Sequence, residues 1–146
     1  MDFQNIPITS LIPQRPPFVM VDRVLSCTDG NAVTELVVSE DNIFLDDMKL
    51  SPAGIMENMA QSCAARMGCV NCLHNESIKM GFIGDIRDCV ILRQPCCHET
   101  LHTHVEIIEE VFNLTLASVT TKVGDETIAT ARMKIALTDM EAVDER

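Results

Sequence analysis

Apolar and polar positions are arranged along this chain in two ways, one typical of strands and one typical of a helix. Positions 18–27 and 32–38 are rich in Val and Met, and the Asp29-Gly30 pair between them is typical of a hairpin turn. Positions 51–73 instead carry small and apolar residues around most of a helix, after a Ser51-Pro52 pair typical of a helix start. A helix that is so apolar must be buried.

Four later segments have the composition of strands: 79–94, 100–111, 112–123 and 126–138. The alternation of apolar and polar residues in these segments predicts a sheet with one buried face and one more solvent-exposed face. Leu101, Leu114 and Leu116 are expected on the buried, covered face. The simplest packing of these elements is an antiparallel sheet of about six strands wrapped around the helix. We therefore expect an α+β fold in a single domain that spans residues 1–146.

The bulk composition excludes several classes of function. The net charge is −11, and the 11 basic residues are scattered, which disfavours nucleic acid and an anionic membrane surface as partners. The aromatic content is 3%, without Trp or Tyr, so the usual stacking platforms for bases and sugars are missing. Small apolar or flexible molecules remain plausible as ligands.

The seven cysteines and the N-terminus indicate a reducing compartment. An odd number of cysteines in a chain with its own core fits free thiols better than disulfides, and nothing at the N-terminus resembles a signal peptide. We expect a cytoplasmic protein. Cys69-x-x-Cys72 together with Cys96-Cys97-His98 has the spacing of zinc ligands, but ordinary thiols are the simpler interpretation. We predict neither a metal nor a cofactor.

One acid inside the apolar helix is the strongest candidate for chemistry. Glu57 lies among Ile55, Met56 and Met59, where a carboxylate without partners is costly or takes up a proton. The alternative is that Glu57 simply points to solvent. Gln61, one turn later, could hold the carboxylate in place by a hydrogen bond.

Three segments of the chain resemble 3-hydroxyacyl-acyl carrier protein dehydratases, which have the hot-dog fold. Residues 11–24 are similar to the family pattern PHRYPFLLVDRV, and residues 51–62 are similar to PGVLxxEAMAQ. Residues 81–107 resemble the strand that carries the family's Arg-x-Pro turn. The matched residues of the first two patterns are Pro13, Arg15, Pro17, Phe18, Val21, Asp22, Arg23, Val24, Gly54, Ile55, Glu57, Met59, Ala60 and Gln61. The resemblance covers nearly the whole chain.

The resemblance implies roles for individual residues. In the family, a histidine from a GHFPG loop removes the α-proton, and a helix glutamate from the partner subunit of a dimer donates a proton to the leaving hydroxyl. Glu57 matches that glutamate, and Gly54 matches the residue whose amide polarises the thioester carbonyl. Further candidate substrate-binding residues near the matched segments are Phe18, Phe44, Ala53 and Met56.

The chain departs from the family at the site itself. The loop NIFLDDMKLSPAG is shorter than the family's and contains no histidine, Pro16 stands in place of a tunnel-gating tyrosine, and Gln14 replaces a histidine. The histidines at 74, 98, 102 and 104 do not follow the family geometry. Asp46 or Asp47 could replace the missing base, with Asp47 as the weaker catalytic candidate beside Glu57, although a charged surface loop is the simpler interpretation.

The sequence therefore predicts a dehydratase-like protein of a degenerate subtype that binds acyl thioesters of acyl carrier protein or coenzyme A. Fatty-acid or polyketide and polyene biosynthesis is the expected setting, and a homodimer or a heterodimer with a paralogue is the expected assembly. Four alternatives stay open: catalysis with a substitute base, a non-catalytic subunit whose partner supplies the histidine, an acyl thioesterase that uses Glu57, and a pure binding protein.

Overall fold

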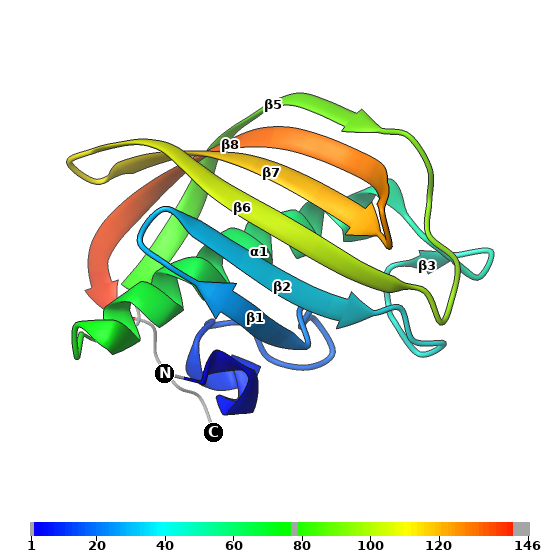
Figure 1. The fold of residues 1–146 in the computed structure, drawn as a ribbon, viewed down its shortest axis with the longest axis horizontal. Helices are drawn as coiled ribbons and strands as arrows, with labels where there is room; N and C mark the ends of the chain where they lie inside the picture. Colours follow the sequence, from blue (N-terminus) through cyan, green and yellow to red (C-terminus); the bar gives the residue numbers. More distant parts are fainter. Residues whose placement is uncertain (1, 77–78, 142–146) are drawn as a thin grey trace.

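The centre of the fold is a long helix, α1 (Pro52–Leu73), seen in green in Figure 1. The computed structural model describes residues 2–76 and 79–141. The helix begins where the sequence predicts, because the Ser51 hydroxyl accepts a hydrogen bond from the Gly54 amide at 3.2 Å and Pro52 follows as the first helical residue. Within the described residues, no helix is long and apolar enough to cross a membrane.

A six-stranded antiparallel sheet wraps around α1, as Figure 1 shows. Its strands, in spatial order, are β1 (Arg23–Cys27), β2 (Asn31–Val37), β6 (Thr100–Val111), β7 (Leu114–Val123), β8 (Glu126–Glu141) and β5 (Lys79–Ile91). The remaining elements are the small hairpin β3 (Leu45–Asp46) and β4 (Lys49–Leu50) and the 3-10 turns η1 (Phe3–Asn5) and η2 (Ile8–Ser10). The predicted α+β hot-dog fold is confirmed.

The main core lies between α1 and the inner face of the sheet. Ile55, Met59 and Cys63 of the helix pack there against alternate residues of the strands. The strand residues of this core include Ala32, Leu36, Leu101, Val105, Ala117, Val119, Ala129, Ala131, Met133 and Ile135. The nearly unbroken apolar sequence of the helix is thus explained by burial.

The alternation of β7 is the reverse of what the sequence suggests. Val105 pairs with Val119 and Ile107 pairs with Ala117, so the odd-numbered residues of β7 share the inner face. Leu114 is 45% exposed and Leu116 is half-buried on the outer face. The prediction that Leu114 and Leu116 belong to the covered face was therefore wrong.

The first strand begins at Arg23 and not at Phe18, because side chains of α1 bind the backbone of the preceding segment. The Gln61 carboxamide donates to the Phe18 carbonyl at 2.8 Å and accepts from the Met20 amide at 2.6 Å. Asn58 donates to the Met20 carbonyl at 2.7 Å. These bonds satisfy backbone groups that strand pairing would otherwise satisfy.

The two edges of the sheet differ in their protection. At one edge, β1 is covered by η1, whose Phe3 is buried in a small cluster with Val24. At the other edge, β5 pairs with β8 and, among the described residues, with no other strand. Edge strands expose unpaired backbone groups and are commonly covered or paired with another chain. The edge at β5 is open.

Candidate functional site

A pocket of about 160 Å³ lies next to Glu57. Its walls come from α1, from the segment that follows η2, and from the inner sides of β5 and β8. The lining residues are Leu11, Pro13, Gln14, Glu57, Ala60, Cys63, Ala64, Met67, Gly68, Gly81, Ile83, Ile135 and Leu137. Glu57 is the one carboxylate in this set, and most of the other residues are apolar.

The helix wall of the pocket is one stripe of α1. Glu57, Ala60, Ala64 and Gly68 follow at intervals of three or four residues, so they share a face of the helix. Most of these side chains are small, which leaves room between α1 and the strands. Half-buried Glu57 stands at the N-terminal end of the stripe.

Gly68 fixes the position of the segment that closes the pocket. A methyl group at Gly68 would lie 2.0 Å from the carbonyl oxygen of Leu11, so any larger residue would displace the backbone there. Leu11, Pro13 and Gln14 line the pocket from this segment. Glycine is unfavourable in a helix interior, and here it is the residue that allows this close approach.

Two polar groups besides Glu57 meet the pocket. Gln14 lines the pocket, and its Oε1 atom is buried without a hydrogen-bond partner among the described residues. Burial raises the pKa of the Cys63 thiol to about 12, an effect that Arg66 only partly opposes. Because this thiol stays protonated near neutral pH, it forms an inert part of the wall and not a nucleophile.

Gln61 does not hold Glu57 by the expected hydrogen bond. Its carboxamide is bound to the backbone at Phe18 and Met20, and among the described residues it makes no hydrogen bond with Glu57. Gln61 is 1% exposed. The structure therefore gives Gln61 a direct role in anchoring the segment before β1.

The predicted substrate-binding residues lie around the start of α1 and outside the pocket. The Gly54 amide is bound to the Ser51 hydroxyl, and the Gly54 backbone is packed so closely on Phe44 and Leu50 that a methyl group would lie 2.7 Å from each. Ala53 and Phe18 are exposed, while Met56 is half-buried. None of these residues lines the pocket of Glu57.

The loop acids stand away from Glu57 on the β3–β4 hairpin. Asp46 pairs with Lys49, and Asp47 is exposed at the tip with a φ of 54°. Neither carboxylate lines the pocket. The structure does not bring the weak candidate Asp47 together with Glu57.

The histidines also lie elsewhere. His102 and His104 alternate with the inward-facing residues of β6, so both lie on the outer face of the sheet. His102 is 2.8 Å from a Glu35 carboxylate oxygen, and His98 is 3.2 Å from a Glu40 carboxylate oxygen. His74 caps the end of α1. The pocket of Glu57 is lined by none of the four.

The two cysteine groups are at opposite ends of α1. Cys69 and Cys72 lie in its last turns, whereas the Cys97 amide donates to the Met48 carbonyl beside the β3–β4 hairpin. A helix of 22 residues is about 33 Å long, so these groups cannot share one ion. Among the described residues, no group of three or more His, Cys, Asp or Glu side chains is placed to hold a metal.

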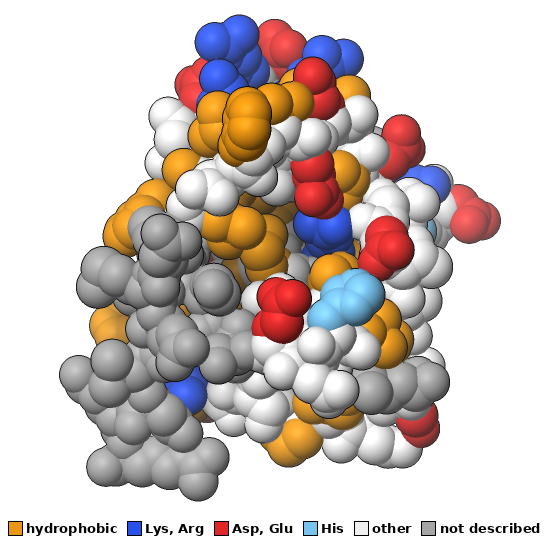
Figure 2. All heavy atoms as spheres, turned by 90° about the vertical axis from the view of Figure 1, so that its left-hand side faces the viewer, with side chains coloured by type: hydrophobic (Ala, Val, Ile, Leu, Met, Phe, Trp, Pro, Cys, Tyr) orange, Lys and Arg blue, Asp and Glu red, His pale blue; other side chains and the backbone are white. Residues whose placement is uncertain are grey.

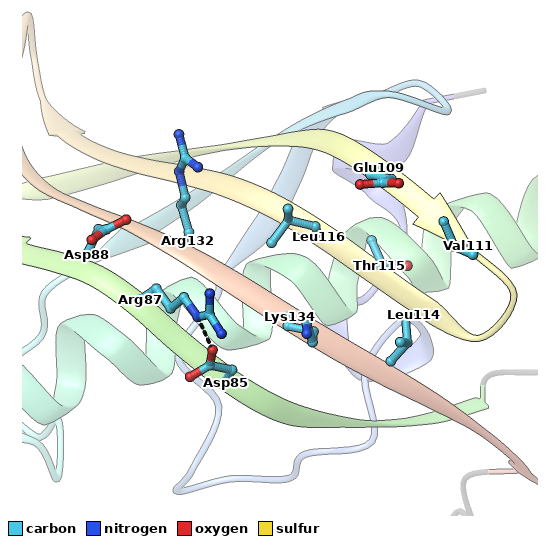
Figure 3. Close-up of a pocket in the computed structure, with 10 residues that line it drawn as sticks. All are labelled: Asp85, Arg87, Asp88, Glu109, Val111, Leu114, Thr115, Leu116, Arg132 and Lys134. Carbon is cyan, nitrogen blue, oxygen red and sulfur yellow. Dashed lines mark hydrogen bonds and ion pairs between the residues drawn. The ribbon is translucent and has the colours of Figure 1, made fainter.

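A second hollow, of about 400 Å³, lies on the outer face of the sheet (Figure 3). Arg132 and Lys134 of β8 line it together with Leu116 of β7 and the ion pair of Arg87 with Asp85 on β5. Figure 2 shows basic and acidic side chains gathered together at the top of the molecule, over this face. The sheet separates this mixed-charge groove from Glu57.

Sequence reasoning missed most of the residues that surround Glu57. Leu11, Gln14, Gly68 and Gly81 come from three separate parts of the chain, and no local pattern joins them. The spacing of small residues along α1 was the available signal. It indicates a face on which other elements approach the helix closely.

Comparisons with known proteins agree with this fold. The model of the ApeP-like family, described as ApeP dehydratase, matches residues 6–144. A search of curated proteins found no match.

Solved structures share the fold at low sequence identity. The dehydratase heterocomplex ApeI:P from Xenorhabdus doucetiae is similar with a TM-score of 0.86 and 16% identity, over 92% of each chain. Protein PH1136 from Pyrococcus horikoshii has a TM-score of 0.69 and 13% identity, over 95% of this chain and 99% of that one. A hypothetical thioesterase with coenzyme A from Streptococcus pneumoniae has a TM-score of 0.64 and 11% identity, over 81% and 86%. Since the family model spans residues 6–144 of the 146, the chain belongs to the ApeP-like dehydratase family.

Proposed function

We propose that this protein is the acid-bearing subunit of a heterodimeric dehydratase that acts on 3-hydroxyacyl thioesters of acyl carrier protein or coenzyme A. The observation that carries the proposal is the placement of Glu57 in a mostly apolar pocket that none of the four histidines lines. Membership of a dehydratase family supports the reaction class. Fatty-acid or polyene-type biosynthesis is the setting in which such substrates occur.

Dehydration of a 3-hydroxyacyl thioester needs one base and one acid. The base removes a proton from C2, the C2–H electron pair becomes the C2–C3 double bond, and the C3–O bond breaks. Glu57, in its protonated form, gives its proton to the departing oxygen, so that the products are a 2-enoyl thioester and water. The apolar walls formed by Leu11, Ile83 and Ile135 keep bulk water away from the reacting carbons.

The base is proposed to come from a partner chain. A paralogous hot-dog subunit with a histidine in its loop would complete the site opposite Glu57, as the resemblance to the dehydratases implies. The ApeI:P structure, which is described as a dehydratase heterocomplex, supports a partner of this kind. Asp46 and Asp47 are less suited to the role, because both are exposed on a hairpin that does not reach the pocket.

Strand β5 is the proposed docking surface for that partner. It is the open edge of the sheet, and Phe82, Ile86 and Val90 are 52%, 39% and 48% exposed there. Exposed apolar residues on an unpaired edge are typical of surfaces that meet another chain. Ile83 of the same strand lines the pocket, so a chain docked on this edge would adjoin Glu57.

The proposal is tested by isolating the complex and measuring its reaction. The tagged chain is purified from its native cells, and the recovered complex is assayed for dehydration of 3-hydroxyacyl thioesters and for hydration of the enoyl product. Glu57→Gln is expected to lower both rates by about 10²- to 10⁴-fold while the complex stays intact. Glu109→Gln, an exposed carboxylate across the sheet, is the matched control and should leave both rates unchanged.

Other outcomes would contradict this assignment in distinct ways. Recovery of self-copies alone, with full dehydratase activity, would mean that a substitute base lies within this chain. Steady release of free thiol from acyl-coenzyme A, abolished in Glu57→Gln, would indicate a thioesterase, since one carboxylate in an apolar pocket is also a workable arrangement for thioester hydrolysis. Acyl binding without turnover of any thioester would indicate that this chain is a binding subunit without catalytic activity.

A further inference from the structure

Gln14 lines the pocket of Glu57, and its amide oxygen is a buried hydrogen-bond acceptor without a partner among the described residues. In the described part of the chain, two buried side-chain polar atoms lack a partner, and the other is Nε of Arg66. The Arg66 guanidinium is already bound through Nη2 to the Asp29 carbonyl at 2.6 Å and to Glu110 at 2.8 Å. Gln14 Oε1 has no comparable bond.

Most of the residues that line the pocket beside Gln14 are apolar. Leu11, Pro13 and Ile135 line the same pocket with apolar side chains. Burying an amide oxygen without a donor destabilises a protein, so such atoms are uncommon and are often associated with function. A ligand that carries a hydroxyl group into the pocket would supply the donor that Gln14 Oε1 lacks.

We propose that Gln14 Oε1 accepts the hydroxyl hydrogen of the substrate and thereby selects 3-hydroxyacyl chains over acyl chains without a hydroxyl group. The inference rests on the proposed role of Glu57 as the acid. Gln14 is then a positioning residue, because it holds the leaving group and takes no part in bond making or breaking.

The hydrogen-bond capacity of a hydroxyl group fits this pair of residues. A hydroxyl has one hydrogen to donate and two lone pairs that accept. Protonated Glu57 donates a hydrogen bond to one lone pair of the hydroxyl oxygen. The hydroxyl then donates its own hydrogen to Gln14 Oε1. When the C3–O bond breaks, the departing water carries one hydrogen from the hydroxyl and one from Glu57, so the bond to Gln14 persists through the reaction.

The size of the pocket limits what it can select. At about 160 Å³ it is smaller than the roughly 300–1,000 Å³ of pockets that enclose a whole drug-sized ligand. It therefore surrounds the acyl head, and the 3-hydroxyl is the donor that an acyl head carries. The amides of a pantetheine arm lie beyond the thioester sulfur and would remain outside.

The test compares two unreactive ligands that differ by one oxygen: pantetheine carrying 3-hydroxybutanamide and pantetheine carrying butanamide. Their dissociation constants are measured by calorimetry with the complex of this chain and its partner, prepared with the wild-type chain or with Gln14→Met, which keeps the unbranched shape and removes the acceptor. We expect wild type to prefer the hydroxy ligand by about tenfold or more, and Gln14→Met to bind both within about twofold. The butanamide affinity should not fall.

Thermal stability separates this role from a structural one. Because the acceptor is unpaired in the free protein, Gln14→Met should keep or raise the melting temperature. A lower melting temperature with an unchanged ligand preference would overturn the inference. So would equal affinity of wild type for both ligands, which would leave the reaction proposed for Glu57 standing. Binding of neither ligand would overturn both.

Discussion

Gly68 of α1 lies directly against the backbone of Leu11, so that a methyl group on Gly68 would be 2.0 Å from the Leu11 carbonyl oxygen. Real side-chain carbons do not approach a backbone oxygen so closely. The contact holds the N-terminal segment against the helix, and the same segment carries Pro13 and Gln14 over the pocket of Glu57. The geometry of the site thus depends on a residue that has no side chain.

Gly68→Ala is therefore expected to destabilise the protein, although alanine favours helix formation over glycine by about 1 kcal/mol. Overpacking against the Leu11 backbone should outweigh that gain and lower the free energy of unfolding by about 1–3 kcal/mol. Urea denaturation followed by circular dichroism measures the change. Gly30→Ala is the control, because nothing lies within 4 Å of a methyl group there. Equal effects of the two substitutions would contradict the contact.

Gln61→Met is expected to lower stability through the segment before β1. The substitution leaves the Phe18 carbonyl and the Met20 amide without their partner, and each unsatisfied buried group costs about 1–3 kcal/mol. Hydrogen exchange at the Met20 amide should accelerate more than exchange within β7. Gln4→Met, on the exposed 3-10 turn η1, should change neither quantity. Normal protection of Met20 in Gln61→Met would mean that the bond contributes little.

The contribution of Glu99 to stability should depend on pH. Arg93 binds both oxygens of this carboxylate at 2.8 and 3.1 Å and the Cys96 amide donates to it, and these bonds lower the pKa of Glu99. A folded-state pKa below the unfolded one means that the stabilisation is present above the unfolded value, near 4.5, and is lost as the pH falls through the folded value.

Glu99→Gln should accordingly lower the free energy of unfolding by about 0.5–1 kcal/mol at pH 7, with the difference from wild type shrinking below about pH 4. Denaturation curves at a series of pH values measure this. Glu106→Gln, an exposed residue of the same strand, is the control. A difference that stays constant down to low pH would show that the effect of the variant is not electrostatic.

Cys27 is expected to be more reactive toward alkylation near neutral pH than an ordinary thiol. A hydrogen bond from the Cys69 thiol is the main cause that lowers the pKa of Cys27, with Arg66 adding to it. The pH midpoint of iodoacetamide labelling, followed by mass spectrometry, should lie below 9 at Cys27 and shift upward in Cys69→Ala. Cys63, whose pKa is about 12, should stay unlabelled in both proteins. An unchanged midpoint in Cys69→Ala would contradict the thiol pair.

Ile86→Glu on β5 is expected to abolish recovery of the proposed partner chain. A charge on the open edge costs free energy only when a second chain covers it, so the variant should fold as well as wild type. Ile108→Glu is the control, because Ile108 of β6 is 47% exposed and Ile86 is 39% exposed. Affinity purification with quantitative mass spectrometry compares the two. Equal recovery of the partner with both variants would place the interface elsewhere.

The fold could be predicted from the sequence where local signals decide the structure. Ser51-Pro52 marks the start of α1 because the cap and the proline act within one turn. Phe18 shows the limit of such signals, since its backbone bonds to Gln61, 43 residues away. The inner face of β7 was likewise decided by pairing with β6, in which Ala117 stands opposite Ile107.

The site was predictable only in part, because it too depends on contacts between residues far apart in the sequence. Glu57 stands out as an acid in an apolar helix, and the structure places it in a pocket. Gln14 stood out in the sequence as a departure from a family pattern, yet the burial of its unpaired oxygen is a property of the folded structure, in which Gly68 lets Leu11 of the same segment approach the helix. Tertiary packing creates such a feature, and no local pattern can report it.

Pairing of two copies through the open edge of β5 would bring together chains that each carry a net charge of −11. Like charges slow the encounter of proteins and oppose close approach. The acidic surface therefore acts against edge-to-edge association of identical chains, a common route to aggregation for an uncovered strand. A less acidic chain would meet the same edge without this repulsion. The net charge thus favours the proposed heterodimer over pairing of two identical chains at this edge.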